Sequence, residues 1–410
     1  MLLTRRQFLQ TTAGLIALLA GGEYGNAAAA SFGRPAESNT LVILSLKGGM
    51  DGLMAAAPLN DRYLTGCRPT LAMTGSMLAL DGQFGLHPSL APLLPLYQAG
   101  QLAMIHGVGS PDPSRFHSDA QYYLEAGTPG SKHSKSGWLN RADALLGGNK
   151  PLSLVSLTHI LPLIMRGERP AAAMANIRDF SYRLGLLRED NARLAQSLQS
   201  MYQQSDYPTL QATAAEIQAV VEKLAAVQQQ SLLPETGILY PNTAFGRAMR
   251  QLAMLIKADA GVRFAFVELE GWDTHIRQGT ANGPFARQAY ELALGMAGFW
   301  QDIGARQQSV VLATLTEFGR TVQENESGGT DHGRGSCSFL LGTQVAGGRV
   351  YGQIPELAPD NLAEGQALPV TTDFRAILAE IFRRHFRLTK YQAIFPGWEA
   401  GAKPLSLWKQ

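Results

Sequence analysis

The sequence predicts an α/β fold in which a central, largely parallel sheet is flanked by helices. Short apolar runs rich in β-branched residues have the length of strands buried on both faces. In the C-terminal half these runs alternate with amphipathic segments, the order expected of a parallel sheet with helical crossovers. The first run, residues 41–46, ends in Gly48 and Gly49, at the kind of turn where α/β proteins bind ligands.

In the first half of the chain, residues 41–46 and 102–106 are the expected strands. Residues 111–145 are long, polar and glycine-containing, and we expect them to form a covering or functional loop. Residues 185–232 are rich in alanine and glutamine, and we expect a helical insertion of two helices broken near Pro208. This insertion covers the sheet or, as the alternative, acts as a lid.

In the second half, strands and helices alternate, and no internal repeat is present. This alternation favours a largely parallel sheet flanked by helices, and the length of the mature chain suits either one large α/β domain with insertions or two domains. The expected elements, in order, are a helix at 244–260, a strand at 262–269, a helix at 285–304, strands at 309–316 and 338–341, and a helix at 373–386.

The N-terminal segment, residues 1–30, has the order of a twin-arginine signal peptide. Arg5 and Arg6 precede an aromatic residue and a leucine, and a short apolar run, 13–20, follows. Four alanines at 27–30 offer cleavage sites, so the mature domain is expected to comprise residues 31–410. An uncleaved N-terminal anchor is the alternative. The pattern predicts export by the twin-arginine translocase and a periplasmic or secreted location.

Composition excludes several classes of partner. The 410-residue chain carries a formal net charge of +2, whereas nucleic-acid or anionic-membrane binding calls for a strongly basic surface. After the signal peptide, no stretch is apolar and long enough to span a membrane. The two cysteines, Cys67 and Cys337, could pair in an oxidising compartment, and their spacing leaves that question open.

Polar side chains collect just beyond the ends of the predicted strands. Asp51 follows the first strand, Asp273 and His275 follow the strand at 262–269, and Glu317 follows the next one. Asp331 and His332 precede the strand at 338–341. Any one of them could be a turn cap or a structural hydrogen-bonding group, but their recurrence at several strand ends favours a site.

Imidazole and carboxylate together are the ligands of a divalent metal. The predicted metal ligands are therefore Asp51, Asp273, His275, Glu317, Asp331 and His332. Zinc is the favoured ion, and manganese, magnesium or calcium are alternatives. A metal that polarises an ester oxygen and lowers the pKa of bound water suits ester hydrolysis.

At these residues the chain resembles a family of twin-arginine-exported bacterial proteins, the domain of unknown function 1501 family. The matching segments are Gly48-Gly49-Met50-Asp51-Gly52, Leu86-His87-Pro88, 271–275, 316–321 and 331–333. That family is in turn similar to the alkaline phosphatase and sulfatase superfamily. The resemblance implies an alkaline-phosphatase-like sheet and a site of two metal ions that acts on phosphate or sulfate esters.

The chain departs from the superfamily pattern in two places. Thr316-Glu317 stands where the superfamily has an Asp-His pair, which leaves the second metal position poor in histidine and compatible with a single ion. The resemblance also implies a hydroxyl or thiol nucleophile, and Ser118 beside His117 is the candidate, displaced by two positions from the usual motif.

The favoured hypothesis is an exported metal-dependent hydrolase that acts on an anionic phosphate or sulfate ester. Ser118 and His117 are its predicted catalytic residues, and Arg320 or Arg334 would bind the anionic group through paired guanidinium hydrogen bonds. The alternative is a non-catalytic envelope or polymer-binding protein on the same fold. An isomerase or phosphomutase is a third, weaker hypothesis.

Overall fold

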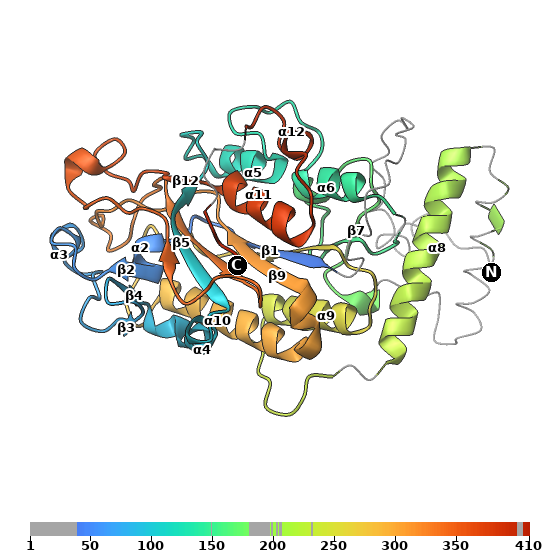
Figure 1. The fold of residues 1–410 in the computed structure, drawn as a ribbon, viewed down its shortest axis with the longest axis horizontal. Coiled ribbons are helices and arrows are strands. Elements are labelled where there is room, and N and C mark those ends of the chain that lie inside the picture. Colours follow the sequence, from blue (N-terminus) through green and yellow to red (C-terminus); the bar gives the residue numbers. More distant parts are fainter. Residues whose placement is uncertain are drawn as a thin grey trace.

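The computed structural model describes residues 39–148, 150–179, 207–230, 233–399 and 405–410, with residues 197, 200, 201 and 204. The predicted signal peptide lies outside the described residues. One large sheet forms the centre of the molecule (Figure 1), with strands in the order β11-β5-β10-β9-β1-β8-β6-β7 and with β12 paired to β5. The strands are β1 (Thr40–Leu46), β5 (Leu102–Gly109), β6 (Leu154–Ser156), β7 (Ala172–Ala173), β8 (Phe264–Leu269), β9 (Val310–Leu315), β10 (Ser336–Leu341), β11 (Val350–Tyr351) and β12 (Thr372–Asp373).

Strand direction explains why chemistry collects at one edge. In the described sheet, β1 pairs in parallel with β8 and β9, and β8 pairs in parallel with β6. β10 runs antiparallel to both β9 and β5, so it is the reversed strand within a parallel sheet. The start of β10 therefore lies at the edge where β1, β8, β9 and β5 end. The predicted, largely parallel sheet is confirmed.

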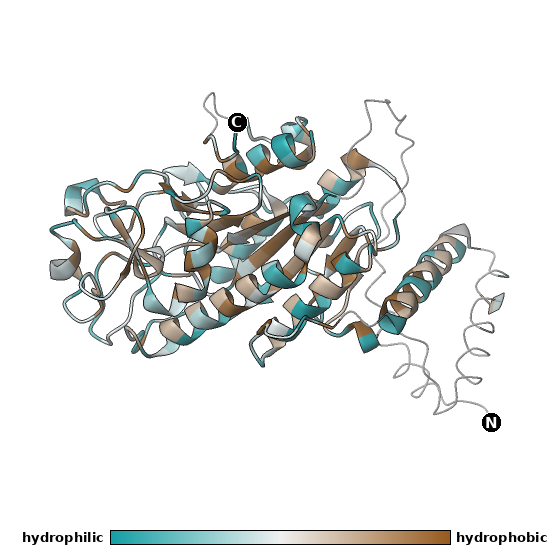
Figure 2. Ribbon diagram, turned by 60° about the horizontal axis from the view of Figure 1, so that its bottom comes forward, coloured by the Kyte–Doolittle hydropathy of each residue, from teal (hydrophilic) through white to brown (hydrophobic). Residues whose placement is uncertain are grey.

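Helices cover both faces of this sheet. Side chains of β1 alternate, so Val42 and Leu44 join the core beneath α9 (Ala244–Lys257) and α10 (Pro284–Asp302). Leu41 and Ile43 join the opposite core. That core includes α6 (Trp138–Leu146) and α11 (Phe374–His385). All seven residues of β1 are buried, as the continuous apolar run predicts, and Figure 2 shows hydrophobic strands between the amphipathic helices.

The predicted loop at 111–145 is wrong over much of its length. It contains α5 (His117–Ala126) and α6, joined by a polar connection. α5 has few apolar side chains, and it buries only Ala120, Leu124 and Ala126, so no clear apolar period marks it in the sequence. It ends at Gly127, whose φ of 69° is the left-handed conformation that terminates helices.

Smaller elements follow β1. A three-stranded sheet, in the order β2-β4-β3, lies beside short helical turns, and His87 caps the turn that begins at Pro88. These elements are α2 (Gly52–Ala55), β2 (Ala56–Pro58), α3 (Leu64–Cys67), β3 (Leu78–Ala79), β4 (Phe84–Leu86), η2 (Pro88–Leu93) and α4 (Leu94–Gln98). Short elements elsewhere are η3 (Leu163–Met165), η4 (Ile177–Asp179), η5 (Gly304–Ser309), η6 (Pro359–Asn361) and α12 (Tyr391–Ile394).

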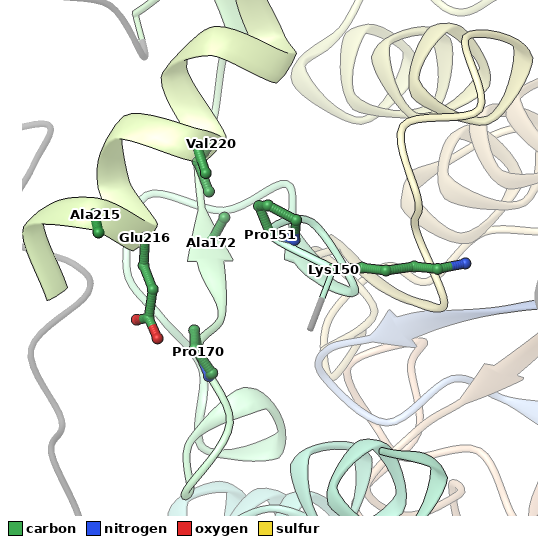
Figure 3. Close-up of a pocket in the computed structure, with 8 residues that line it drawn as sticks. Lys150, Pro151, Pro170, Ala172, Ala215, Glu216 and Val220 are labelled. Atoms are coloured by element: carbon green, nitrogen blue, oxygen red, sulfur yellow. The ribbon is translucent and has the colours of Figure 1, made fainter. Parts of the chain in front are cut away.

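The predicted insertion contains one long described helix, α8 (Pro208–Gln229). Val220, Leu224 and Val227 attach it to the core on the α9 side of the sheet. A cavity of about 150 Å³ separates part of α8 from the β7 region, with Glu216 on its wall (Figure 3). Most of the residues predicted to form the first helix of the insertion lie outside the described part of the chain.

Two further expectations concern the membrane and the cysteines. None of the helices in the described residues is long and apolar enough to cross a membrane. Cys67 and Cys337 are both free thiols in the structure. Cys337 is buried in β10, and burial raises the pKa of its thiol to about 12.

A buried histidine in β5 makes stability dependent on pH. His106 is 0% exposed, its Nε2 lies 2.7 Å from the carbonyl of Ala56, and burial lowers its pKa to about 4. Because the folded pKa is depressed, the unfolded chain binds the proton more tightly between about pH 6.5 and pH 4, and stability falls as pH falls through that range. Between about pH 7 and pH 5 this group is expected to remove about 2 kcal/mol of unfolding free energy.

The measurement is the urea unfolding free energy of the wild type and of His106→Gln, which keeps a donor but does not titrate in this range. The variant is expected to have the flatter pH dependence, and exposed His133→Gln is the matched control. Equal pH slopes for the wild type and His106→Gln would refute the assignment.

Candidate functional site

Four side chains from distant parts of the chain meet at the carboxyl edge of the sheet. Asp273 and His275 lie in the connection after β8, His117 begins α5, and His332 lies in the segment before β10. His332 reaches this edge because β10 is reversed, so the residues preceding it lie beside residues that follow the parallel strands. The sequence predicted this convergence for Asp273, His275 and His332.

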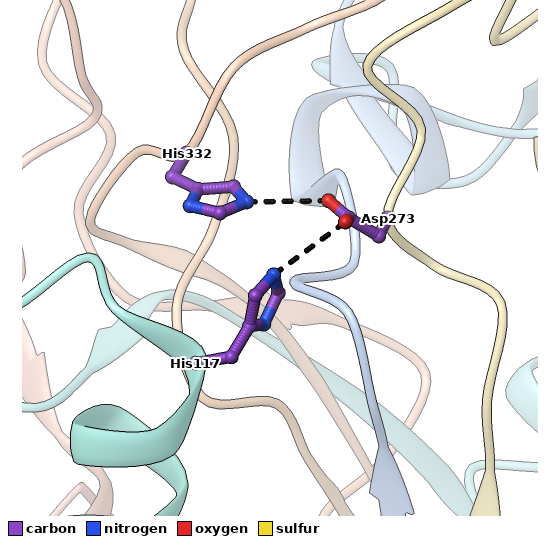
Figure 4. Close-up of side chains that lie close together, drawn as sticks. All are labelled: His117, Asp273 and His332. Atoms are coloured by element: carbon purple, nitrogen blue, oxygen red, sulfur yellow. Dashed lines mark hydrogen bonds and ion pairs between the residues drawn. The ribbon is translucent and has the colours of Figure 1, made fainter.

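The imidazole Nε2 atoms of these histidines surround the Asp273 carboxylate. His275 Nε2 lies 3.1 Å and His332 Nε2 lies 3.2 Å from Asp273 Oδ1. His117 Nε2 lies 3.6 Å from Asp273 Oδ2, so it approaches the other oxygen (Figure 4). Ligand atoms of His117, Asp273 and His332 all lie within 4.8 Å of one another, which is a separation that one metal ion can bridge.

The opposite ring nitrogen of each histidine is held by an acceptor. Nδ1 of His117 lies 2.9 Å from Glu317 Oε1, and Nδ1 of His275 lies 2.8 Å from Asp331 Oδ1. Nδ1 of His332 lies 2.8 Å from the carbonyl oxygen of Arg115. Because carboxylates and carbonyls can only accept, each Nδ1 donates a proton to its acceptor, which leaves each Nε2 directed toward Asp273.

This arrangement fits a cation. The Nε2 atoms of His275 and His332 are 2.9 Å apart, and two lone pairs at that distance repel unless a proton or a metal ion lies with them. Metal-binding histidines characteristically donate their other N–H to a carboxylate or a carbonyl, which fixes the ring and raises its basicity. Imidazole nitrogens with one carboxylate are a zinc ligand set. The donor types, the protonation pattern and the spacing therefore agree.

Arg320 holds the Asp273 carboxylate in place. Its Nη2 lies 2.5 Å from Asp273 Oδ1, and its side chain is 0% exposed. Burial alone would raise the pKa of Asp273, but the hydrogen bond and the charge of Arg320 outweigh it and hold the pKa below its usual value. Asp273 is therefore ionised at neutral pH and available to a cation.

Glu317 has the same supporting function for His117. Its Oε1 also accepts from the backbone N–H of Gly48 at 2.8 Å and from Gln121 at 3.2 Å. Burial opposes ionisation of Glu317, yet the hydrogen bond from His117 and the backbone donors lower its pKa. The hydrogen bond to Glu317 in turn raises the pKa of His117. Glu317 and Asp331 thus support imidazoles rather than lying in the central group.

Gly48 is required for this packing. Its φ is +120°, and a Cβ there would lie 2.4 Å from the backbone nitrogen of Asp273. The close backbone approach expected of the glycine turn is therefore an approach to the segment that carries Asp273.

Asp51, predicted as a metal ligand, belongs to a different interaction. Both of its oxygens bind the guanidinium of Arg68, at 2.8 and 3.0 Å, and they also accept from Gln278 and from the N–H of Met54. Asp51 and Arg68 are each 1% exposed. Four donors occupy the acceptor positions of this carboxylate, so the structure corrects the predicted ligand set by removing Asp51 from it.

The predicted catalytic residues also separate. His117 lies in the cluster, but Ser118 is exposed on α5 and its hydroxyl donates to Asp119 at 3.2 Å. Arg320 does not face a substrate, because its N–H groups are taken by Asp273 and by the carbonyls of Gly49 and Thr330, among others. The structure therefore corrects the predicted catalytic roles of Ser118 and Arg320, because the O–H and N–H groups of these side chains donate to acceptors within the protein.

Two residues that shape the site, Arg115 and Arg68, have no clear signal in the sequence. The Arg115 carbonyl orients His332, and backbone atoms leave no residue-type signal. Arg68 lies in the irregular segment after α3 with no periodic context, although a buried aspartate always calls for a cationic partner.

The fold and this cluster define an α/β protein with a histidine and aspartate site at the carboxyl edge of its sheet. The chain belongs to the family described as "Protein of unknown function (DUF1501)", which matches residues 70–394. A search of the curated proteins found no match.

Among solved structures, the chain is similar to the lipoteichoic acid synthase LtaP from Listeria monocytogenes. The two are 11% identical, the match covers 80% of this chain and 72% of that chain, and the TM-score is 0.34. A similarity this low carries no argument about the activity of this chain.

The Asp51–Arg68 pair generates a stability prediction. Arg68→Met would leave a buried carboxylate without its partner, and the expected loss of unfolding free energy is about 3–5 kcal/mol. The control is Arg62→Met at the exposed pair with Glu356, where the loss should be much smaller because solvent screens an exposed pair. Denaturant midpoints of the two variants, compared with the wild type, measure this difference, and similar losses would contradict the assignment.

Proposed function

We propose that the protein is an exported, metal-dependent hydrolase of phosphate or sulfate esters. The observation that carries the proposal is the arrangement of His117, His275 and His332, whose Nδ1 atoms face acceptors while their Nε2 atoms face Asp273. The Nε2 atoms of His275 and His332, 2.9 Å apart, repel unless a proton or a metal ion lies with them, and a metal site accounts for three imidazoles gathered around one carboxylate.

His117, Asp273, His275 and His332 would hold the ion. A divalent ion at this position supplies a bound water of lowered pKa and polarises an ester oxygen. Zinc is the favoured ion because imidazole predominates among the ligands, and manganese, magnesium or calcium are the alternatives.

Within this proposal the supporting residues keep the ligands oriented. Glu317 and Asp331 fix the Nδ1 protons of His117 and His275, so that Nε2 of each ring is left for the ion. Arg320 keeps Asp273 ionised and fixed. We assign the nucleophile to water rather than to Ser118, because the Ser118 hydroxyl donates to Asp119, which is paired with Lys132.

Two other arginines are the candidates for binding the anionic ester. Arg115 and Arg334 flank His332, Arg115 through its carbonyl and Arg334 two residues along the chain. Both guanidiniums contact the half-exposed carboxylate of Glu364, at 2.6 and 3.6 Å. A phosphate or sulfate group has the charge and the paired oxygens to replace that carboxylate.

Export by the twin-arginine route to the periplasm or the medium completes the proposal. It rests on the order of arginine pair, apolar run and alanine site in residues 1–30. The test of this route is a fusion of residues 1–30 to a reporter protein that is active outside the cytoplasm only if it folded in the cytoplasm before export.

The central prediction concerns metal content. Purified protein is expected to retain a stoichiometric divalent ion and to hydrolyse an aryl phosphate or an aryl sulfate. His332→Ala and Asp273→Asn are expected to lose both the ion and the activity, because each removes a ligand. Elemental analysis and hydrolysis rates measure this, with exposed His133→Ala as the matched control.

Wild-type protein with no stoichiometric metal and no activity on either ester would refute the hydrolase. The non-catalytic envelope or polymer-binding alternative would then remain. Binding of a partner that persists in His332→Ala would favour that alternative.

A second prediction concerns the supporting carboxylates. Asp331→Ala removes the acceptor of the His275 Nδ1 proton without removing a ligand, and metal affinity is expected to fall about 10–100-fold. Competition with a chelating dye measures the affinity. Glu326→Ala, an exposed acid in the same loop, should have little effect. Equal losses in the two variants would mean that only general negative charge matters.

A further inference from the structure

A second feature lies at the same edge of the sheet as the metal cluster. It is a cavity of about 940 Å³, near the upper end of the usual range of about 300–1,000 Å³ for ligand pockets. Lys47, Glu125, Glu268, Glu270, Gln288 and Glu291 are among the residues that line it. The metal cluster does not use these side chains.

The segments that follow strands β1 and β8 connect the cavity to the metal cluster. After β1, Lys47 lines the cavity while its neighbour Gly48 donates to Glu317. After β8, Glu270 lines the cavity and Asp273 follows three residues later. The two sites are therefore neighbours along two adjacent strands.

Helix α5 gives the distance between the cavity and the metal cluster. His117, Gln121 and Glu125 recur at intervals of four and so lie on one face of the helix. The first two contact Glu317 and the third lines the cavity. Eight residues of α-helix rise about 12 Å, so a molecule that reached from the ion to Glu125 would extend about that far.

The cavity wall presents hydrogen-bond donors and acceptors together, since arginines, threonines and side-chain amides line it beside the glutamates. Oε1 of Gln288 is buried and has no hydrogen-bond partner within the described part of the chain. A buried acceptor without a donor costs free energy, which a ligand donor would recover. Lys47 is neutralised by Glu268 at 2.5 Å, so its ammonium is not a free anion-binding group.

The charges of the lining point to a neutral ligand. The four glutamates, Glu125, Glu268, Glu270 and Glu291, outnumber the three cationic residues of the lining, Lys47, Arg166 and Arg247. Burial raises the pKa of Glu125 above its usual value. With Lys47 paired to Glu268, the other charged side chains of the lining carry both signs, and neutral hydroxyl groups match this mixture of carboxylates, guanidiniums and amides.

We propose that this cavity binds the alcohol portion of the ester substrate and that this portion is a carbohydrate of more than one sugar unit. The inference rests on the proposed hydrolase function and adds its substrate class, a phosphate or sulfate ester of an oligosaccharide or polysaccharide. The anionic ester group lies at the metal cluster, and the sugar hydroxyls lie in the cavity. Sugar hydroxyls, which both donate and accept, donate to Gln288 Oε1 and to the glutamates and accept from the arginines and amide groups of the wall.

The first test measures binding without catalysis. The full-length protein is titrated calorimetrically with a panel of short neutral oligosaccharides of glucan, galactan and chitin type, which carry no ester. Binding of at least one panel member is expected, and Gln288→Leu and Glu291→Ala should each weaken it about tenfold. Gln301→Leu, an exposed position on the same helix, is the matched control and should bind like the wild type.

The second test separates this inference from the proposed function. Hydrolysis of a simple aryl ester tests the metal cluster, and hydrolysis of a sulfated or phosphorylated oligosaccharide tests the cavity as well. Gln288→Leu and Glu291→Ala should raise KM for the oligosaccharide ester about tenfold more than for the aryl ester.

The outcomes are distinguishable. Aryl ester hydrolysis without binding of any panel oligosaccharide overturns the carbohydrate site and leaves the hydrolase intact. Binding of a polyamine in place of the oligosaccharides also overturns it, in favour of a cationic ligand. Oligosaccharide binding in a protein with no hydrolytic activity refutes the hydrolase and leaves a carbohydrate-binding cavity.

Discussion

The site depends on the buried guanidinium of Arg320. It donates to the carbonyls of Gly48 and Gly49 after β1, to that of Trp272 after β8 and to that of Thr330 before β10, as well as to Asp273. Three connections that are distant in sequence are thus bound to one rigid, planar cation. The geometry of the guanidinium suits this function, because its donors are fixed in one plane and always charged. Since loop carbonyls and Asp273 share one partner, the position of Asp273 follows from the packing of the loops.

The reversed strand β10 gives this edge its second source of ligands. A purely parallel sheet delivers residues to its carboxyl edge only after strands, as it does here for Glu317 and Asp273. Because β10 pairs antiparallel with β9 and β5, the residues before it arrive at the same edge. His332 and Asp331 come by this path, and an isolated bridge between Arg320 and His332 aligns the two segments. A mixed sheet therefore concentrates more chemistry at one edge than strand ends alone provide.

Much of the fold could be predicted from the sequence because its main strands are buried on both faces. An apolar run such as 41–46 identifies such a strand without knowledge of its neighbours, whereas α5 buries too few apolar residues to be recognised. In the site, the convergence of Asp273, His275 and His332 could be predicted because each of them lies near the end of a predicted strand. The division between ligands and supporting acceptors could not be predicted, because it depends on which oxygen each Nδ1 reaches. Asp51 was misassigned for the same reason, since its partner Arg68 is a tertiary contact without a sequence pattern.

The net charge of the cluster and its supporting residues matches the charge of a divalent ion. Asp273, Glu317 and Asp331 are carboxylates of lowered pKa, and Arg320 offsets one of the three negative charges. Two negative charges therefore remain, located mainly behind the imidazoles of His117 and His275. A divalent ion neutralises them, and two protons on the imidazoles would do so in its absence. Because a metal ion and protons would compete for the same nitrogens, ion binding would release protons, and the supporting carboxylates would set how strongly the rings hold either one.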